Sequence, residues 1–403
     1  MINRPFWIQR LENAWQETPI VWLAGVRRIG KTTLVQSLGE DRIRYLNCDL
    51  PVVEEIIAQP EIFFRSCEQP IVVFDEVHQL RDPSRILKIG ADLFPHLKIV
   101  ATGSSTLAAS KKFKDSLTGR KRDVHLKPVL WDELPAFNNS AIEKRLLHGG
   151  LPQALLASKK NPEFYREWMD SFFVRDIQKL FAFRNPDKFT SLFEYVIKQS
   201  GGLMETTRTA SALGISRATV DIHLQALSAT HAVTIVRPFF GGGQKEIIKM
   251  PKIYAFDTGF VSFYRGWDHL RPDDYGHLWE HIVLEYLSAN VLSADIQYWR
   301  DAAGREVDFV IRTGRDSVDA VECKWDPRQF DSTSLKAFRT WYPNGLNYLV
   351  CPDVGEGYLK NVGGFDVFVC NPLFWLKKFL LQSSNPLLKN KRPKPCKKTQ
   401  QGQ

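Results

Sequence analysis

The stretch at residues 19–38 reads PIVWLAGVRRIGKTTLVQSL. Its first six residues form an apolar run that suits a buried strand. Residues 25–32 then give the pattern G-x-x-x-x-G-K-T, which an amphipathic helix pattern follows at once; this strand, loop and helix order is typical of a phosphate-binding P-loop. Gly25 and Gly30 permit backbone angles that let successive N–H groups point inward at phosphate oxygens. The positive end of the helix dipole would face the same phosphates.

Two side chains of this loop have chemical roles that follow from their positions. Lys31 is expected to reach the β- and γ-phosphates of a nucleotide, and the Thr32 hydroxyl to ligate Mg²⁺. The loop residues expected to contact nucleotide are Gly25, Val26, Arg27, Arg28, Ile29, Gly30, Lys31, Thr32 and Thr33.

A second apolar run, at residues 70–74, ends in Asp75 and Glu76. Four consecutive apolar residues suit a central parallel strand, and the carboxyl end of such a strand is where open α/β sheets bind ligands. Asp75 is therefore predicted to hold Mg²⁺ through water, and Glu76 to polarise the attacking water as general base. Without a P-loop before it, the same pair would be read as a solvated strand end.

A third strand is predicted at residues 97–102, and a further one at residues 44–49 between the P-loop and Asp75. Thr102 and Ser104 stand at the tip of the third strand, where a hydroxyl can sense the γ-phosphate or orient water. The alternative is a polar turn or a helix cap. The strand inserted between the two motifs is typical of one branch of the P-loop ATPases.

Together, residues 25–33, 74–78, 102–105 and 117–120 resemble the AAA+ superfamily. More narrowly, they are similar to the bacterial and archaeal ATPases with a C-terminal domain of unknown function, the DUF4143 group. The resemblance implies that Arg120 is an arginine finger acting in trans in a homo-oligomer; the alternative is a surface arginine in the basic stretch at residues 111–122. Val26 stands where that group commonly has proline or alanine, which leaves phosphate binding intact.

Beyond residue 140 the apolar spacing becomes helical, notably at residues 164–183. Arg175 in this stretch approaches nucleotide from a lid or forms a structural salt bridge. Residues 206–250 read as a winged helix-turn-helix, with a helix at 207–213, a turn at Gly214, a second helix capped by Ser216, and a hairpin at 232–250. This unit is a DNA reader or an intramolecular packing module. Its second helix carries only two basic side chains, Arg217 and His223, together with the acid Asp221. This leaves little positive charge to contact DNA phosphates.

Residues 275–368 combine an amphipathic helix at 276–285 with strands at 298–300, 306–311 and 320–325. Their acids and lysine resemble the PD-(D/E)xK nuclease fold, which implies that Asp308 and Glu322 share a metal, that Lys324 activates water, and that Glu280 completes the site. The alternative is a nuclease-like fold that does not cleave.

Composition sets the frame for these motifs. The chain has 403 residues with 44% hydrophobic and 25% charged residues, which predicts a globular protein of two to four domains. The net charge is +9, but six cations and no acid lie in residues 383–403, so the rest carries only +3. That tail should be disordered, and it either touches polyanions or only solubilises the chain. No apolar run spans a membrane, and the six scattered cysteines predict a reducing cytoplasm.

The expected fold class is α/β: a P-loop NTPase parallel sheet with helices on both faces, a helical and winged-helix unit, and a mixed α/β restriction-endonuclease-like domain. The expected boundaries are 1–137, 138–270, 271–378 and a basic tail at 379–403. We expect a cytoplasmic, Mg²⁺-dependent ATPase coupled to DNA or to the nuclease-like domain, with no membrane partner. The alternative is a regulatory ATPase whose C-terminal units make protein contacts.

Overall fold

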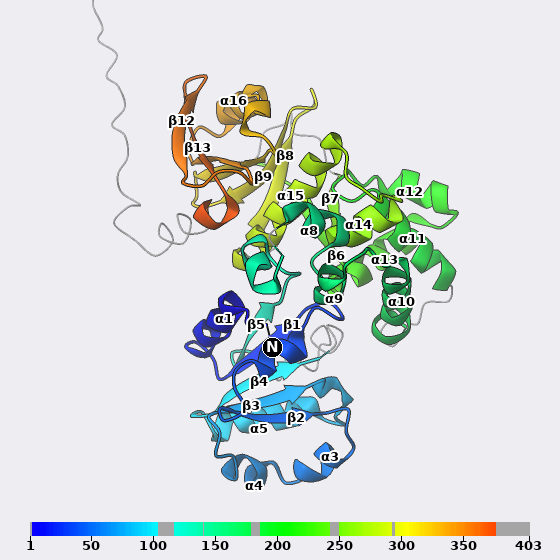
Figure 1. Cartoon of the computed structure of the whole chain (residues 1–403), viewed down its shortest axis with the longest axis vertical. Coiled ribbons are helices and arrows are strands. Elements are labelled where there is room, and N and C mark those ends of the chain that lie inside the picture. Colours follow the sequence, from blue (N-terminus) through cyan, green and yellow to red (C-terminus); the bar gives the residue numbers. More distant parts are fainter. Residues whose placement is uncertain are drawn as a thin grey trace, which may run out of the picture.

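The computed structural model describes residues 2–103, 117–139, 141–178, 186–241, 250–291 and 295–375. Figure 1 shows the parallel sheet with α3, α4 and α5 in the lower part of the molecule, and the helical middle unit and a mixed sheet in the upper part. No described helix is long and apolar enough to cross a membrane.

The N-terminal sheet is parallel and has the order β2-β3-β4-β1-β5. β1, β3 and β4 are mainly apolar strands, as the sequence predicts, and β2 is the strand expected between the P-loop and Asp75. The fifth strand, β5, was not predicted. The bounds are β1 Ile20–Ala24, β2 Ile43–Asn47, β3 Ile71–Asp75, β4 Lys98–Thr102 and β5 Lys121–His125. This order confirms the P-loop NTPase fold.

Alternating side chains of the parallel sheet build two hydrophobic layers. On one face, Val21 and Leu23 of β1 pack with α1 and α2. On the other face, Ile20 and Trp22 pack with α3, α4 and α5. The helices are α1 Pro5–Trp15, α2 Lys31–Gln36, α3 Val52–Ile56, α4 Pro60–Arg65 and α5 Pro83–Leu93, with a 3₁₀ turn η1 at Val77–Gln79. Since both faces are covered, ligand access is left to the strand ends.

The middle unit is mainly helical, but it also contributes two strands, β6 Val233–Pro238 and β7 Lys252–Ala255, to the second sheet. Its helical elements are η2 Trp131–Phe137, α8 Ile142–His148, α9 Pro152–Leu156, α10 Pro162–Phe172, the π-helical turn η3 Phe173–Ile177, α11 Pro186–Lys198, α12 Thr206–Leu213, α13 Arg217–Ala229 and α14 Thr258–Tyr264. The expected helix-turn-helix elements are present: Gly214 is left-handed (φ 61°) and the Ser216 side chain caps α13. The expected helix at 164–183 is interrupted, because α10 passes into η3 at residue 173.

The second sheet is mixed and has the order β12-β13-β11-β10-β9-β8-β6-β7. Its elements are β6 Val233–Pro238, β7 Lys252–Ala255, α15 Pro272–Asn290, β8 Ile296–Arg300, β9 Glu306–Arg312, β10 Val318–Cys323, η5 Pro327–Gln329, α16 Thr333–Trp341, β11 Asn347–Val350, β12 Tyr358–Val362 and β13 Phe365–Cys370. β6 and β7 are antiparallel, and β6 pairs in parallel with β8. The sheet therefore runs across the predicted boundary at residues 270 and 271.

Two predicted strands differ from the structure. The second strand of the hairpin lies at Lys252–Ala255, after the predicted range, and residues 242–249 lie outside the described residues. β10 ends at Cys323, so Lys324 follows the strand; its backbone N–H donates to the carbonyl of Val350.

Candidate functional site: a phosphate loop beside a large cavity

The P-loop connects β1 to α2 with three residues in the left-handed half of backbone space. Gly25 has φ 148° and Gly30 has φ 97°, and a Cβ on Gly25 would lie 2.9 Å from the carbonyl oxygen of Leu126. Arg28 also has a positive φ, of 58°, which the sequence did not predict. Such strain in a non-glycine residue is typical of functional loops.

The Lys31 ammonium folds back over this loop. Its Nζ donates to the carbonyl oxygens of Gly25 at 3.0 Å and Val26 at 3.3 Å. Burial lowers the pKa of Lys31, and the negative charges of Glu76, Asp176 and Asp75 oppose this. The loop therefore holds a cation at its mouth, as phosphate binding requires.

Asp75, the last residue of β3, is contacted by side chains from β2, β4 and α2. Its carboxylate accepts a hydrogen bond of 2.8 Å from Thr32 and one of 2.6 Å from the Tyr45 hydroxyl, and it accepts another from Thr102. Burial and the hydrogen bond to Asp75 raise the pKa of Tyr45. The structure thus brings Thr32, Asp75 and Thr102 together, and it adds Tyr45.

This donor set fits Mg²⁺. A hydroxyl and a carboxylate are the hard oxygen ligands that Mg²⁺ prefers, with one or two carboxylates supplemented by substrate phosphates. The Thr32 and Asp75 oxygens lie 2.8 Å apart at the carboxyl end of β3, next to the loop that would hold the phosphates.

Glu76 follows Asp75 in a left-handed conformation, with φ 55°. Its backbone N–H donates to Thr102 at 3.0 Å, and its carboxylate lies 3.2 Å from Nδ1 of His78. Burial would raise the pKa of Glu76, but the hydrogen bond with His78 and the charge of Lys31 prevail and lower it. Glu76 is therefore ionised at neutral pH, as a general base must be.

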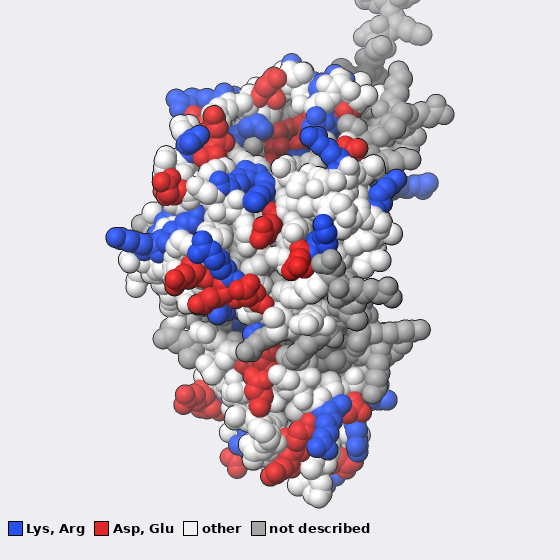
Figure 2. All heavy atoms as spheres, turned by 90° about the vertical axis from the view of Figure 1, so that its right-hand side faces the viewer, with Lys and Arg blue, Asp and Glu red and all other residues white. Residues whose placement is uncertain are grey.

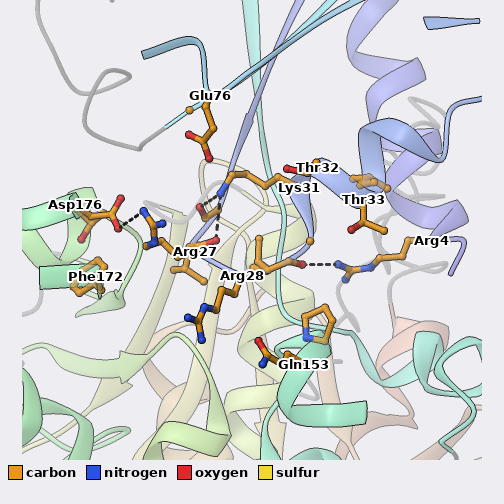
Figure 3. A pocket seen from close by; sticks show the side chains of 18 of the residues that line it. Arg4, Arg27, Arg28, Lys31, Thr32, Thr33, Glu76, Gln153, Phe172 and Asp176 are labelled. Carbon is orange, nitrogen blue, oxygen red and sulfur yellow. Dashed lines mark hydrogen bonds and ion pairs between the residues drawn. The ribbon is translucent and has the colours of Figure 1, made fainter. Parts of the chain in front are cut away.

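A cavity of about 710 Å³ opens in front of the P-loop. Figure 3 shows Lys31 and Glu76 facing it from the parallel-sheet domain, with Asp176 and Phe172 on the opposite wall. Its apolar lining includes Ile2, Phe137 and Leu156. The cavity therefore lies between the parallel-sheet domain and the middle unit.

Three contacts join the loop to the far wall. Arg27 lies 3.6 Å from Asp176, and its carbonyl accepts a hydrogen bond of 3.0 Å from Trp168. Arg28 lies 3.6 Å from Glu167. Burial raises the pKa of Asp176, while the Arg27 charge opposes this. The π-helical turn places Asp176 at the cavity, and such turns often occur at functional sites.

Arg4 anchors the other side of the loop. It forms a buried ion pair with Glu133 at 2.6 Å, and it donates to the carbonyls of Ile29 and Lys127 at 3.5 and 3.1 Å. The sequence analysis missed Arg4, Tyr45 and Asp176. Of these three residues, only Arg4 had a local feature that could have drawn attention to it: it is a cation directly before Pro5, the first residue of α1.

Some expected site residues lie elsewhere. Arg120 lies at the amino end of β5, away from the carboxyl ends of the strands, and donates to Asp92 at 2.5 and 3.0 Å. Its role in trans stays a prediction. Ser104, the side chain of Arg175 and the basic tail lie outside the described residues.

The four nuclease-like candidates meet at a second place, on the mixed sheet. Lys324 lies 3.4 Å from Glu322 and 3.6 Å from Asp308. Glu280 of α15 lies 3.0 Å from Lys252 of β7, a lysine that the sequence analysis missed. Burial raises the pKa of Glu280 and of Glu322.

The predicted DNA-reading helix, α13, offers few exposed cations. Its His223 is buried against Phe189, with ring centroids 5.2 Å apart. Figure 2 shows basic and acidic side chains intermixed over the visible face of the molecule, without a continuous basic band. DNA binding by this unit stays a prediction.

Three family models match parts of the chain. An AAA domain model matches residues 17–134, a domain of unknown function (DUF8612) matches residues 139–271, and the domain of unknown function DUF4143 matches residues 275–360. The chain thus carries an AAA domain and a DUF4143 domain, which confirms the resemblance drawn from the motifs. None of these three models tests the nuclease-like fold.

Curated relatives include proteins of Mycobacterium tuberculosis and Mycobacterium bovis, named "Uncharacterized protein Rv2008c" and "Uncharacterized protein Mb2031c". Each is 26% identical over 320 residues, which cover 77% of this chain and 71% of the relative.

Solved structures with some similarity include a DNA replication initiation factor (14% identity, 53% of this chain and 70% of that one, TM-score 0.27). Another is Cdc6p from Pyrobaculum aerophilum (12% identity, 65% and 93%, TM-score 0.25). These TM-scores are low, and the P-loop NTPase fold rests on the strand order of the parallel sheet.

Proposed function

We propose that this protein binds ATP with Mg²⁺ and hydrolyses it. The basis is an AAA domain in which the P-loop and the acidic end of β3 lie next to each other. One observation carries the proposal: Lys31, Thr32, Asp75 and Glu76 all lie at the carboxyl edge of the parallel sheet, at or beside one cavity of about 710 Å³. A P-loop without this acidic partner could bind phosphate but would have no group to activate water.

The roles of the residues follow from their contacts. The Lys31 ammonium, held by two loop carbonyls, is available to exchange them for phosphate oxygens. Residues 25–31 line the cavity, and the backbone N–H groups of such a loop can bind anions. Thr32 and Asp75 would hold Mg²⁺, which would neutralise charge on the phosphates.

Glu76 is the proposed general base. Its carboxylate is ionised, lines the cavity and is oriented by His78 and by the backbone contact with Thr102. It can therefore accept a proton from a water placed between it and the phosphates. Apolar Ile2, Phe137 and Leu156 line the same cavity, which suits the flat face of an adenine ring.

The cavity lies between two units, and this suggests a switch. Asp176 of the middle unit faces Arg27 of the P-loop, so a bound triphosphate would compete with Asp176 for that arginine. We propose that ATP binding and hydrolysis change the position of the middle unit relative to the parallel sheet.

The test is phosphate release by the full chain, together with binding of a fluorescent ATP analogue. Lys31→Ala should lose both binding and turnover. Glu76→Gln should keep binding but lose turnover by about 10²- to 10⁴-fold, the usual contribution of a general base. Lys336→Ala, which removes an exposed lysine of α16, is the matched control and should change neither.

Turnover in Lys31→Ala equal to that of the unaltered protein would overturn the proposal. The same assay with and without double-stranded DNA tests whether the ATPase is coupled to DNA, as the sequence analysis expects. DNA stimulation that falls steeply with salt would support it, because phosphate contacts release counterions.

A further inference from the structure

Four carboxylates gather where α15 crosses the mixed sheet, and we name this group the acidic centre. Its members are Glu280 of α15, Glu306 and Asp308 of β9, and Glu322 of β10. Residues 306 and 308 share a face of β9 because side chains alternate along a strand. Glu306 was not among the residues that the sequence analysis selected.

Lys252 of β7 reaches into the acidic centre. Its Nζ lies 3.0 Å from Glu280 and 2.5 Å from Glu306, and its side chain is only 5% exposed. Tyr254, two residues along the same strand, donates to the same Glu280 oxygen that Lys252 contacts. The middle unit therefore supplies the cation for carboxylates of the C-terminal unit.

Two further cations contact the acidic centre. Lys324 lies between Asp308 and Glu322, at 3.6 and 3.4 Å, and Arg300 lies 2.8 Å from Glu306 at the outer side. Asp308 also accepts the backbone N–H of Cys323 at 2.8 Å. Four carboxylates thus face three cations that the chain itself provides.

A divalent metal does not fit this arrangement. Mg²⁺ and Ca²⁺ bind oxygens at about 2.0–2.6 Å, and one oxygen each of Glu280 and Glu306, Oε1 in both, already contacts the Lys252 ammonium. Within residues 2–375 as the structure describes them, no group of three or more His, Cys, Asp or Glu side chains is arranged to hold a metal ion. The metal-dependent nuclease mechanism that the motif implies therefore lacks its metal site.

We propose that Lys252 is the resident cation of the acidic centre, that it closes the centre to divalent metals, and that it locks β7 of the middle unit to α15 and β9. The centre then serves as a joint between the two units. The same joint includes the strand pairing of β6 with β8, which continues the sheet from one unit into the other.

The experiment counts bound Mn²⁺ by electron paramagnetic resonance in the nucleotide-free full chain. Every protein in the series carries Asp75→Asn, which removes the carboxylate proposed to hold metal at the P-loop. The first protein is this background alone. Three others add Asp308→Asn, Lys252→Met, or both of these substitutions to it. The fifth protein adds Arg300→Met to the background.

The background and the background with Asp308→Asn should bind the same amount of Mn²⁺, because the acidic centre holds none in either protein. Lys252→Met should gain about one Mn²⁺ per chain, because hard oxygen ligands are freed, and the added Asp308→Asn should abolish it. Arg300→Met is the matched control: it takes a cation from the same Glu306 but from the outer side, and should gain none.

Two results would overturn the proposal: an Asp308-dependent Mn²⁺ in the background, or a folded Lys252→Met chain that binds no Mn²⁺. Circular dichroism and a cooperative melt establish folding. If Lys252→Met does not fold, the background against Asp308→Asn still decides whether the centre takes metal.

Discussion

The hydroxyl of Thr32 donates a hydrogen bond of 2.8 Å to the carboxylate of Asp75, although 43 residues separate them in the chain. The first residue is on α2 directly after the P-loop and the second is the last residue of β3. A helix and a strand of the parallel-sheet domain thus bring a hydroxyl and a carboxylate to one point, where we propose that a magnesium-bound triphosphate is held.

This contact leads to the first prediction. Thr32→Val keeps the shape of the side chain but removes its oxygen, so ATP turnover should fall by about 10²-fold or more, since metal neutralisation of phosphate charge is lost. The measurement is steady-state phosphate release across a Mg²⁺ titration. Thr340→Val, on an exposed hydroxyl of α16, should leave turnover unchanged. Equal Mg²⁺ dependence in Thr32→Val and the unaltered protein would contradict the assigned role.

The buried pair of Arg4 and Glu133 supports the second prediction. Both side chains are at most 5% exposed, so removal of one partner leaves an uncompensated buried charge. Arg4→Met should lower the free energy of unfolding by about 3–5 kcal/mol, measured by urea denaturation. It should also weaken ATP binding, because Arg4 supports the carbonyl of Ile29 in the P-loop.

The matched control for this pair is Arg122→Met, whose partner Glu17 is 57% exposed. Its cost should stay below about 1 kcal/mol, as for other surface pairs. If both variants lost equal stability, the burial argument for Arg4 would fail.

The fold and the centre of the site could be predicted from the sequence because both depend on residues that are close together in the chain. The spacing of Gly25, Gly30, Lys31 and Thr32 lies within eight residues, and the Asp75 strand end is an apolar run followed by an acid. Each could be read without knowing what packs against it, and the parallel-sheet fold was confirmed on that basis.

The residues that were missed depend on contacts between distant segments. Tyr45 reaches Asp75 across 30 positions, Arg4 reaches Glu133 across 129, and Lys252 reaches Glu280 across 28. No periodicity marks such pairs, since tertiary packing alone brings them together. Lys252 had one usable signal: a lysine within an otherwise apolar strand, residues 251–256, needs a buried acidic partner.

The third prediction concerns Arg120, which pairs with Asp92 at the end of the sheet opposite the P-loop. In its own subunit it cannot reach the phosphates, so a catalytic role requires a second copy of the chain. Arg120→Ala should reduce turnover by about 10³-fold, as for other arginine fingers. Mixing Arg120→Ala with Lys31→Ala should restore activity, because mixed oligomers combine an intact loop with an intact arginine.

Asp92→Ala is the control for this mixing assay. It frees Arg120 without removing it and should keep turnover. If the mixture stays as inactive as its components while each variant is folded, Arg120 is a surface arginine.

The fourth prediction follows from two histidines beneath the P-loop. His125 and His231 lie with ring centroids 4.4 Å apart, next to Gly25 and Val26. Burial, aided by the Lys127 charge, lowers the pKa of His125 to about 4, and burial, aided by the charge of His125, lowers the pKa of His231 to about 3. Both rings are therefore neutral in the folded protein.

The unfolded chain, with histidine pKa values near 6.5, binds more protons than the folded chain between pH 6.5 and 4. The contribution of the two histidines to the free energy of unfolding should therefore be greatest above pH 6.5. It should decrease as the pH falls towards 4, by on the order of 3 kcal/mol for each histidine. His125→Gln with His231→Asn should flatten this slope in urea denaturation at stepped pH; Asn is chosen because residue 231 has φ 60°, which Asn tolerates. His269→Gln, on an exposed histidine, should not flatten it. A slope that survives in the double variant would place the acid sensitivity elsewhere in the chain.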